Sequence, residues 1–151
     1  GNYKIAVIIE ALTDNKNRTA SQIREIFQKN GGNLGTQGSA AHNFKQLGII
    51  RIDASELDAD KMLEIAINSG ADECFSNKNF HEIHCNKENI YNIKKVIEKN
   101  ATKFLSTNVE WYPVNKVKLE EDKLLQTKKF LELLEDHDDV QKVYSNLEML
   151  G

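Results

Sequence analysis

The stretch Gly48-Ile-Ile-Arg-Ile-Asp53 decides the fold, because it opens an ordered series of strand and helix patterns. Its apolar residues predict a strand. Apolar residues from Met62 to Ile67 then line one face of a helix, which Ser69-Gly70 ends. Ser55-Glu-Leu-Asp58, just ahead of this helix, resembles a capping box with Asp in place of the usual Glu. The pattern therefore predicts a strand followed by a helix.

A hairpin, a second helix and a last strand follow. Ala71–Ser76 and Phe80–Cys85 predict two strands joined by a short polar turn. Apolar residues between positions 90 and 97 recur at helical spacing, and residues 103–112 predict a further strand. The order over residues 48–112 is β-α-β-β-α-β, which is the split β-α-β arrangement of ferredoxin-like folds.

The residues outside this block repeat the same order. Tyr3–Leu12 predicts a strand that is buried on both faces, and Arg18–Asn30 predicts a helix that Gly31-Gly32 ends. Another strand is expected near Ser39–Phe44. After the block, a strand, a helix and a strand are expected at Val117–Leu119, Glu120–Glu135 and Val140–Tyr144.

The two patterns together define the predicted fold. We expect an α+β protein made of two ferredoxin-like split β-α-β lobes, one inserted into the other. The outer lobe is expected to be a discontinuous α+β domain of residues 1–46 and 114–151. The inserted lobe is expected to be a β-α-β-β-α-β domain of residues 47–113.

The composition is that of an ordinary folded protein. The chain has 151 residues, of which 40% are hydrophobic and 28% are charged, and its net charge is −3. No apolar run approaches the roughly 18 residues that cross a bilayer, and no leader pattern marks the chain for export. Cys74 and Cys85 form no disulfide framework, which suits a reducing compartment. We therefore expect a cytoplasmic protein without a membrane partner.

Positive charge is concentrated in the first third of the chain. Residues 1–50 carry six Lys or Arg against three Asp or Glu, a net charge of +3, so the remaining residues carry −6. An anionic partner would be met by this first third. A surplus of three charges in a short segment also arises by chance, and both interpretations stay open.

Four residues of zinc-ligand type lie near one another in the sequence: Cys74, His81, His84 and Cys85. Their spacing argues against a metal site. On a strand, His81 and Cys85 share one face while His84 points to the other. The spacing His-x-x-His is also not that of the helical pair of a metalloprotease. We expect solvent-facing histidines on a hairpin and no bound metal.

No segment assembles a recognisable catalytic or cofactor motif. The acidic run Glu135-Asp-His-Asp-Asp139 lacks the spacing of a calcium loop and is expected to be a turn. The sequence contains no nucleophile elbow, phosphate loop or dinucleotide fingerprint. No nucleophile is placed beside a base, so we expect neither an enzyme nor a cofactor.

The segment Thr13-Asp-Asn-Lys-Asn-Arg-Thr19 carries the best candidate site. It joins the first strand to the first helix and places Lys16 and Arg18 at the start of that helix. Free N–H groups there attract anions, and Arg adds a forked phosphate contact. Helix capping explains the Asp, Asn and Thr residues of this segment equally well. The predicted nucleic-acid-binding residues are Asn15, Lys16, Asn17, Arg18, Thr19, Arg24, Lys29 and Lys45.

The stretch Ala6-Val-Ile-Ile-Glu-Ala-Leu-Thr-Asp-Asn-Lys-Asn-Arg-Thr-Ala20 resembles a motif of the YebC/PmpR family. Gly31-Gly-Asn-Leu-Gly35 and Gly38-Ser39 follow as in that family, and Leu134–Asn146 resembles its closing segment. The resemblance covers nearly the whole chain. It implies an N-terminal helical bundle, then an α+β domain with a ferredoxin-like domain inserted. We expect this chain to begin at the second of these domains and to lack the bundle.

The resemblance also implies a function. It points to DNA-binding transcriptional regulators and to RNA- or ribosome-associated translation factors. We therefore expect a non-enzymatic regulator of gene expression that binds nucleic acid or the ribosome. Binding is expected to be led by phosphate and shape, since no helix-turn-helix or RNP aromatic motif is visible. The alternatives are a small-ligand-sensing module and a protein–protein adaptor, and the oligomeric state is not predicted.

Overall fold

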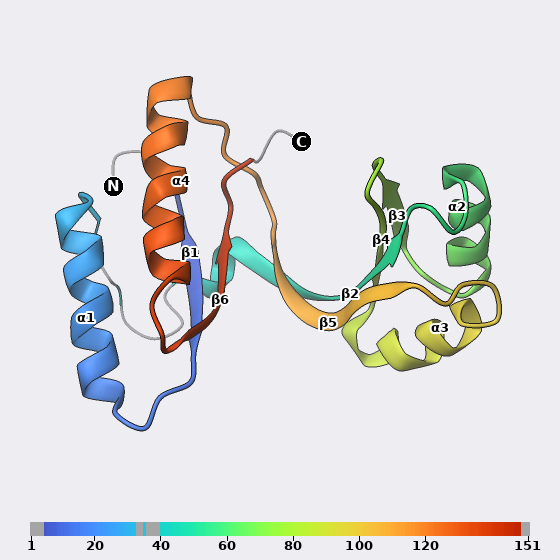
Figure 1. The fold of residues 1–151 in the computed structure, drawn as a ribbon, viewed down its shortest axis with the longest axis horizontal. Helices are drawn as coiled ribbons and strands as arrows, with labels where there is room; N and C mark the ends of the chain where they lie inside the picture. Colours follow the sequence, from blue (N-terminus) through green and yellow to red (C-terminus); the bar gives the residue numbers. More distant parts are fainter. Residues whose placement is uncertain (1–4, 33–34, 36–39, 149–151) are drawn as a thin grey trace. The chain divides into compact units, whose positions relative to one another are not determined.

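The computed structural model describes residues 5–32, 35 and 40–148. The chain forms two compact units (Figure 1). The outer unit contains residues 1–45 and 112–151, and the inner unit contains residues 46–111. Helices and antiparallel strands are combined in both, so the predicted α+β class is confirmed. Over the described part of the chain, no helix is both long and apolar enough to span a membrane.

The inner unit is built from a four-stranded sheet and two helices. Its elements are β2 (Phe44–Asp53), α2 (Ala59–Asn68), β3 (Glu73–Ser76), β4 (Phe80–Cys85), α3 (Ile90–Ile97) and β5 (Phe104–Pro113). The strand order is β3-β4-β2-β5, and β4 is antiparallel to both β2 and β3. Helix α2 joins β2 to β3, and α3 joins β4 to β5, which is the predicted split β-α-β order.

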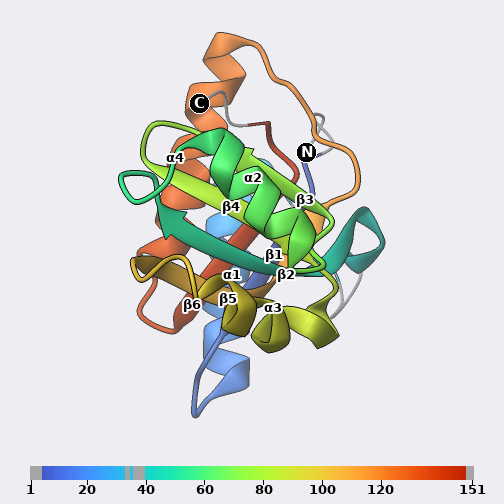
Figure 2. The ribbon, with the colours of Figure 1, turned by 90° about the vertical axis from the view of Figure 1, so that its right-hand side faces the viewer.

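Helices α2 and α3 lie on the same face of the inner sheet (Figure 2). Side chains of the sheet and of both helices form the core of the inner unit. Ile50 from β2, Met62 from α2 and Ile97 from α3 meet there, and each is 0% exposed. Gly48 allows the close approach of its neighbours, because a Cβ at this position would lie 2.8 Å from Cys85 Sγ. The alternating apolar residues of the sequence thus build a dry core on one face of the sheet.

Helix α2 begins differently from the predicted capping box. Asp58 is its N-cap residue, and the carboxylate accepts a hydrogen bond of 2.8 Å from the Lys61 N–H. Ser55 lies in the preceding turn, where its N–H donates to Asp53 Oδ1 at 2.8 Å. The helix ends at Asn68 and is followed by Ser69 and Gly70, as predicted; the φ of Gly70, 99°, lies in the left-handed region that favours glycine.

The two strand histidines are buried, and the prediction that they face solvent is wrong. His81 is 2% exposed and His84 is 3% exposed. An odd spacing in β4 places them on opposite faces, as predicted. The ring nitrogens of His81 bond Ser76 Oγ and the Leu57 carbonyl, both at 2.7 Å, so His81 has a structural role. Within the described residues, no group of three or more His, Cys, Asp or Glu side chains is placed to hold a metal ion.

The sheet face that carries His84 holds a largely buried polar network. Arg51 Nε donates to Glu82 Oε1 at 2.9 Å, and its Nη1 and Nη2 donate to the two carboxylate oxygens of Glu110 at 2.7 and 3.2 Å. His84 Nε2 donates to Glu82 Oε2 at 2.7 Å. This hydrogen bond, aided by the Arg51 charge, holds the pKa of the Glu82 carboxyl below its usual range. The network ties β2, β4 and β5 together.

The outer unit combines two strands with two helices. Its elements are β1 (Val7–Ala11), α1 (Lys16–Lys29), α4 (Glu121–Glu135) and β6 (Val140–Ser145). β1 pairs antiparallel with β6, and α1 lies beside α4 (Figure 1). Phe27 of α1 meets Phe130 of α4 edge to face, with ring centroids 5.0 Å apart. The buried cluster of this unit consists of Ile23, Phe27, Leu131, Leu134 and Leu147.

The outer sheet is smaller than predicted. β1 is only partly buried, because β6 is its sole strand partner in the described part of the chain; the expected burial on both faces is wrong. Of the strand expected near Ser39–Phe44, Ser39 lies outside the described residues. Ala41–Asn43 form a 3₁₀ helix before β2 begins. Val117 makes an isolated parallel bridge to Leu147 instead of the expected strand.

Candidate nucleic-acid interface

The cationic turn between β1 and α1 is held by its own short polar side chains. Asn15 is the N-cap of α1, and its Oδ1 accepts a hydrogen bond of 3.0 Å from the Arg18 N–H. Thr13 Oγ1 accepts a hydrogen bond of 3.0 Å from the Asn15 N–H. Because Asn15 caps the helix, α1 begins at Lys16, two residues before the predicted start.

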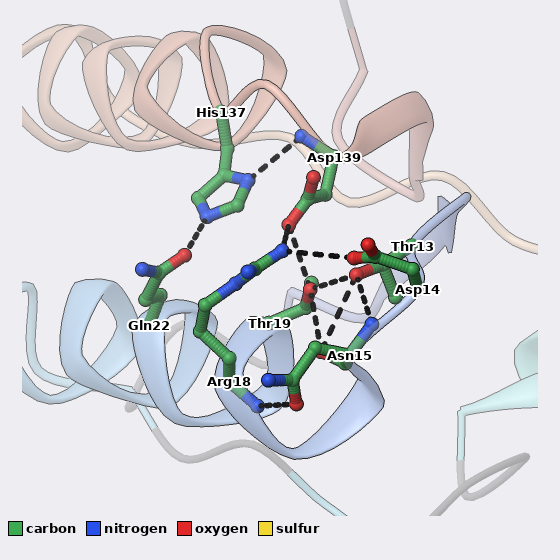
Figure 3. A network of polar contacts seen from close by, with 8 residues as sticks. All are labelled: Thr13, Asp14, Asn15, Arg18, Thr19, Gln22, His137 and Asp139. Atoms are coloured by element: carbon green, nitrogen blue, oxygen red, sulfur yellow. Dashed lines mark hydrogen bonds and ion pairs between the residues drawn. The ribbon is translucent and has the colours of Figure 1, made fainter.

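Thr19 anchors this turn to the opposite end of the chain. It is 3% exposed, and its hydroxyl lies 2.8 Å from Thr13 Oγ1 and 2.7 Å from Asp139 Oδ2 (Figure 3). Asp139 directly precedes β6, so the contact joins the start of α1 to the turn after α4. The structure therefore places Thr19 inside the turn, where it serves the fold, and its hydroxyl is not presented to a partner.

Arg18 points toward the same carboxylate and shares its charge with two acids. Its Nη2 lies 3.4 Å from Asp14 Oδ1 and 3.7 Å from Asp139 Oδ2 (Figure 3). The Arg18 side chain is 49% exposed, so the pairs are partly solvated and weak. A phosphate at Arg18 would compete with two carboxylates that already lie beside it. Arg18 is therefore a poorer phosphate ligand than its place in the sequence suggests.

His137 connects the turn after α4 to the middle of α1. Its Nε2 lies 2.7 Å from Gln22 Oε1, and its Nδ1 accepts a hydrogen bond of 3.1 Å from the Asp139 N–H (Figure 3). These contacts match a neutral ring that carries its proton on Nε2. The acidic run 135–139 is thus a turn, as predicted, but one that is tied to α1 by a specific side chain.

An open groove of about 590 Å³ lies between α1 and the turn after α4. Its cationic residues are Arg18 and Lys29, and the Lys29 Nζ lies 2.9 Å from Glu25 Oε1. The carboxylates in its lining outnumber these cations. The lining residues are Arg18, Gln22, Glu25, Ile26, Lys29, Asp136, His137, Asp138 and Asp139. This charge balance disfavours a polyanion in the groove.

The remaining predicted residues lie outside the groove. Lys16, Asn17 and Arg24 are exposed on α1, and Arg24 lies two turns along the helix from Asn17. Lys45 is exposed near the start of β2, apart from α1 in the sequence and absent from the groove lining. Exposed side chains of α1 that are either uncharged or cationic lie along one stripe of the helix. This polar stripe consists of Asn17, Ser21, Arg24 and Gln28.

Sequence patterns did not reveal which residues contact the predicted site. Asp139, His137 and Gln22 organise the turn and the groove, yet only the acidic character of run 135–139 was visible. The contact from Thr19 to Asp139 spans 120 residues, and the one from Gln22 to His137 spans 115. Local patterns carry no signal for pairings at such separations.

Comparisons with known proteins place the chain in a family. Residues 1–147 match the family described as TACO1/YebC second and third domain. A relative from Pelagibacter ubique (strain HTCC1062), named probable transcriptional regulatory protein, is 62% identical over 147 residues. These cover 97% of this chain and 61% of the relative.

A solved structure supports the same assignment. The crystal structure of a conserved hypothetical protein from Aquifex aeolicus superposes with a TM-score of 0.89 at 35% sequence identity. The match covers 97% of this chain and 61% of that chain. This chain thus spans about 61% of the length of both proteins. It belongs to the TACO1/YebC family, of which it contains the second and third domains.

Proposed function

We propose that the chain is a non-enzymatic, cytoplasmic regulator of gene expression that binds nucleic acid through Lys16 and the polar stripe of α1. The name of the 62% identical relative, a probable transcriptional regulatory protein, supports a regulatory role. Lys16 and Arg24 support an anionic partner, because both are exposed and, among the described residues, neither lies within ion-pair distance of a carboxylate.

The observation that carries the proposal is the charge at the start of α1. Its first turn contains no acidic residue. It contains the exposed Lys16, which, unlike Arg18, lies within ion-pair distance of no carboxylate among the described residues. A cation at a helix N-terminus costs about 0.3–1 kcal/mol, because the helix dipole is positive there. A bound phosphate would turn this repulsion into attraction. We infer that the chain tolerates the unfavourable placement because an anionic partner uses it.

The cysteine environments support binding without covalent chemistry. Burial raises the pKa of the Cys74 thiol and of the Cys85 thiol, which keeps both protonated and weakly nucleophilic. Cys85 is also packed in the inner core at 0% exposure. His81 and His137 are both engaged in hydrogen bonds that organise the fold.

The salt dependence of binding tests the interface. Lys16→Ala combined with Arg24→Ala should remove two phosphate contacts. The slope of log K against log salt should then flatten by about 1.8 on duplex DNA and about 1.4 on single strands. Lys78→Ala combined with Lys129→Ala is the matched control, because it removes two exposed lysines elsewhere. An unchanged slope in the Lys16 and Arg24 variant would rule out this interface.

The target class needs a separate experiment. We propose binding led by phosphate and shape, with duplex DNA, structured RNA and the ribosome as the candidate targets. Co-sedimentation with ribosomes, set against capture of RNA polymerase, distinguishes translation from transcription. Loss of the captured partner in the Lys16 and Arg24 variant, and its retention in the control, would link that partner to α1.

The groove supports a second candidate function, the sensing of a small ligand. Its lining brings Arg18 and Lys29 opposite Asp136 and Asp138, which suits a molecule that carries both charges. A thermal-shift series with amino acids and nucleotides tests this. A ligand at 100 times its Kd should add about 2.7 kcal/mol of stability. No shift with any of these compounds would count against the groove as a sensor.

A further inference from the structure

The segment around α3 concentrates positive charge within an acidic unit. Residues 87–103 carry five lysines against two glutamates, a net charge of +3. The inner unit as a whole carries eight Lys or Arg against eleven Asp or Glu, a net charge of −3. The rest of the unit is therefore strongly acidic. The lysines are Lys87, Lys94, Lys95, Lys99 and Lys103.

The outward face of α3 combines two of these lysines with an aromatic ring. Ile90, Ile93 and Ile97 point into the core and are at most 3% exposed. Tyr91 points outward and is 70% exposed. Lys95 follows one helical turn later and is also exposed. Lys99 continues this spacing of four residues in the turn that closes the helix.

The charges of this face are available to a partner. Among the residues that the structure describes, Lys95 and Lys99 have no carboxylate within ion-pair distance. Two other lysines of the segment are engaged by neighbours. Lys94 Nζ lies 5.3 Å from the centre of the Phe104 ring, and Lys87 Nζ donates to Gln46 Oε1 at 2.9 Å. The ammonium groups of Lys95 and Lys99 are thus accessible to a partner at the surface.

Tyr91 has no structural role that would explain its ring. Across the described ranges, neither a ring contact nor a hydrogen bond engages it. An exposed aromatic ring beside unpaired lysines matches the way in which proteins hold single strands. Bases stack on the ring, and the backbone phosphates meet the cations.

We propose that Tyr91, Lys95 and Lys99 form a binding site for single-stranded nucleic acid. One base stacks on the Tyr91 ring, and the adjacent phosphates contact the two lysines. An acidic protein segment would use the lysines alone and leave the ring without a role, so a single strand accounts for more of the face. The site lies on the inner unit and does not depend on the interface proposed for α1.

Fluorescence anisotropy on the 151-residue chain with labelled oligouridine and oligothymidine tests the site. All variants carry Lys16→Ala and Arg24→Ala, so that the α1 contribution is already removed. Tyr91→Ala should weaken single-strand binding about 5- to 150-fold, whereas Tyr91→Phe should keep it, because the ring is retained. Lys95→Ala with Lys99→Ala should flatten the salt slope by about 1.4. Lys61→Ala with Lys78→Ala, an equal loss of charge in the same unit, should leave the slope unchanged.

Three results would overturn the proposal. The first is equal single-strand affinity for Tyr91→Ala and Tyr91→Phe. The second is competition by inorganic polyphosphate as effective as that by oligouridine, since this indicates a site for anions only. The third is a flattened slope for the Lys95 and Lys99 variant without any effect at Tyr91, which indicates phosphate contacts without base stacking. A selective loss at Tyr91 supports the site, and the tighter of the two strands identifies RNA or DNA as its source.

Discussion

Helix α1 and the segment around α3 carry the same surplus of positive charge, +3, but expose it differently. On α1, Arg18 lies beside Asp14 and Asp139, and Lys29 pairs with Glu25. In the segment around α3, Lys95 and Lys99 have no such partner in the described residues. The charge that a partner meets is what remains after pairing within the protein. Counting Lys and Arg along the sequence therefore overstates the positive charge that α1 presents to a partner.

The cause of the difference lies in what packs beside each helix. The turn after α4 brings Asp136, Asp138 and Asp139 to the flank of α1, where they form one side of the groove. Helix α3 is held mainly by its apolar stripe, whose members pack into the inner core. Its outward lysines are thus exposed to solvent, and they are better candidates for contact with a polyanion than the cations of α1.

Separating the inner unit from the outer unit should have the largest effect on binding, because it removes α1 and keeps α3. We propose that the inserted domain folds by itself. Residues 44–113, which contain all of β2 and β5, should unfold in one cooperative transition in urea and keep the single-strand binding of α3. The salt dependence due to α1 should disappear. A non-cooperative transition would contradict the domain assignment, and a folded piece without binding would contradict the α3 site.

Arg51→Met should lower the stability of the inner unit substantially. It leaves the Glu82 and Glu110 carboxylates, which are 18% and 13% exposed, without their cation. The expected cost is about 3 kcal/mol in the free energy of unfolding, measured by urea denaturation. Lys61→Met, at an exposed pair, is the control and should change stability by less than about 0.5 kcal/mol. Equal stability of the two variants would show that the network contributes little.

Thr19→Val should lower stability by a smaller amount. The substitution keeps the shape of the side chain but removes the hydroxyl that bonds Asp139 Oδ2 at 2.7 Å. We expect a loss of about 1–2 kcal/mol, because a largely buried acceptor loses its partner. Ser21→Ala, on the exposed side of the same helix, serves as the control. A Thr19 variant as stable as this control would show that the contact does not hold α1 to the turn.

Acid should weaken the inner unit through Glu82. Its pKa is held below the ordinary value of 4.5, chiefly by the hydrogen bond from His84. A carboxyl with a lowered pKa in the folded state contributes stability that is complete above 4.5 and is lost as the pH falls toward the folded value. Glu82→Gln should therefore reduce the fall in stability below that pH. Parallel pH curves for the two proteins would contradict this assignment.

Lys16→Glu should have the smallest effect on stability, and its sign is informative. Replacing a cation by an anion in the first turn of α1 should stabilise the protein by about 0.5–1 kcal/mol. The same change should weaken nucleic-acid binding, because it repels phosphate. Denaturation and anisotropy measure the two quantities. A variant that is more stable and binds equally well would refute a role of Lys16 in binding.

Much of the inner unit could be predicted from local patterns. The strand and helix periods of residues 48–112 gave the observed order, and Gly70 ends α2 where expected. Helix α1 begins two residues before the predicted start, because Asp14, Asn15 and Thr19 are all capping candidates in the sequence and only the structure identifies Asn15 as the N-cap. The histidines were placed on the correct faces but with the wrong exposure. A strand pattern predicts the face of the sheet on which a side chain lies, whereas its burial depends on neighbours such as Leu57 and Glu82.

The candidate binding residues also show which properties follow from the sequence and which follow from the tertiary structure. The sequence by itself determined that cations open α1 and that Tyr91 and Lys95 lie one turn apart, because helix geometry is local. Only the tertiary structure decided which of these cations are available. Asp139 follows the inserted residues in the sequence, and its carboxylate contacts Thr19 and Arg18, which precede them. Such pairing depends on how distant segments fold together, and the charge of either segment alone does not reveal it.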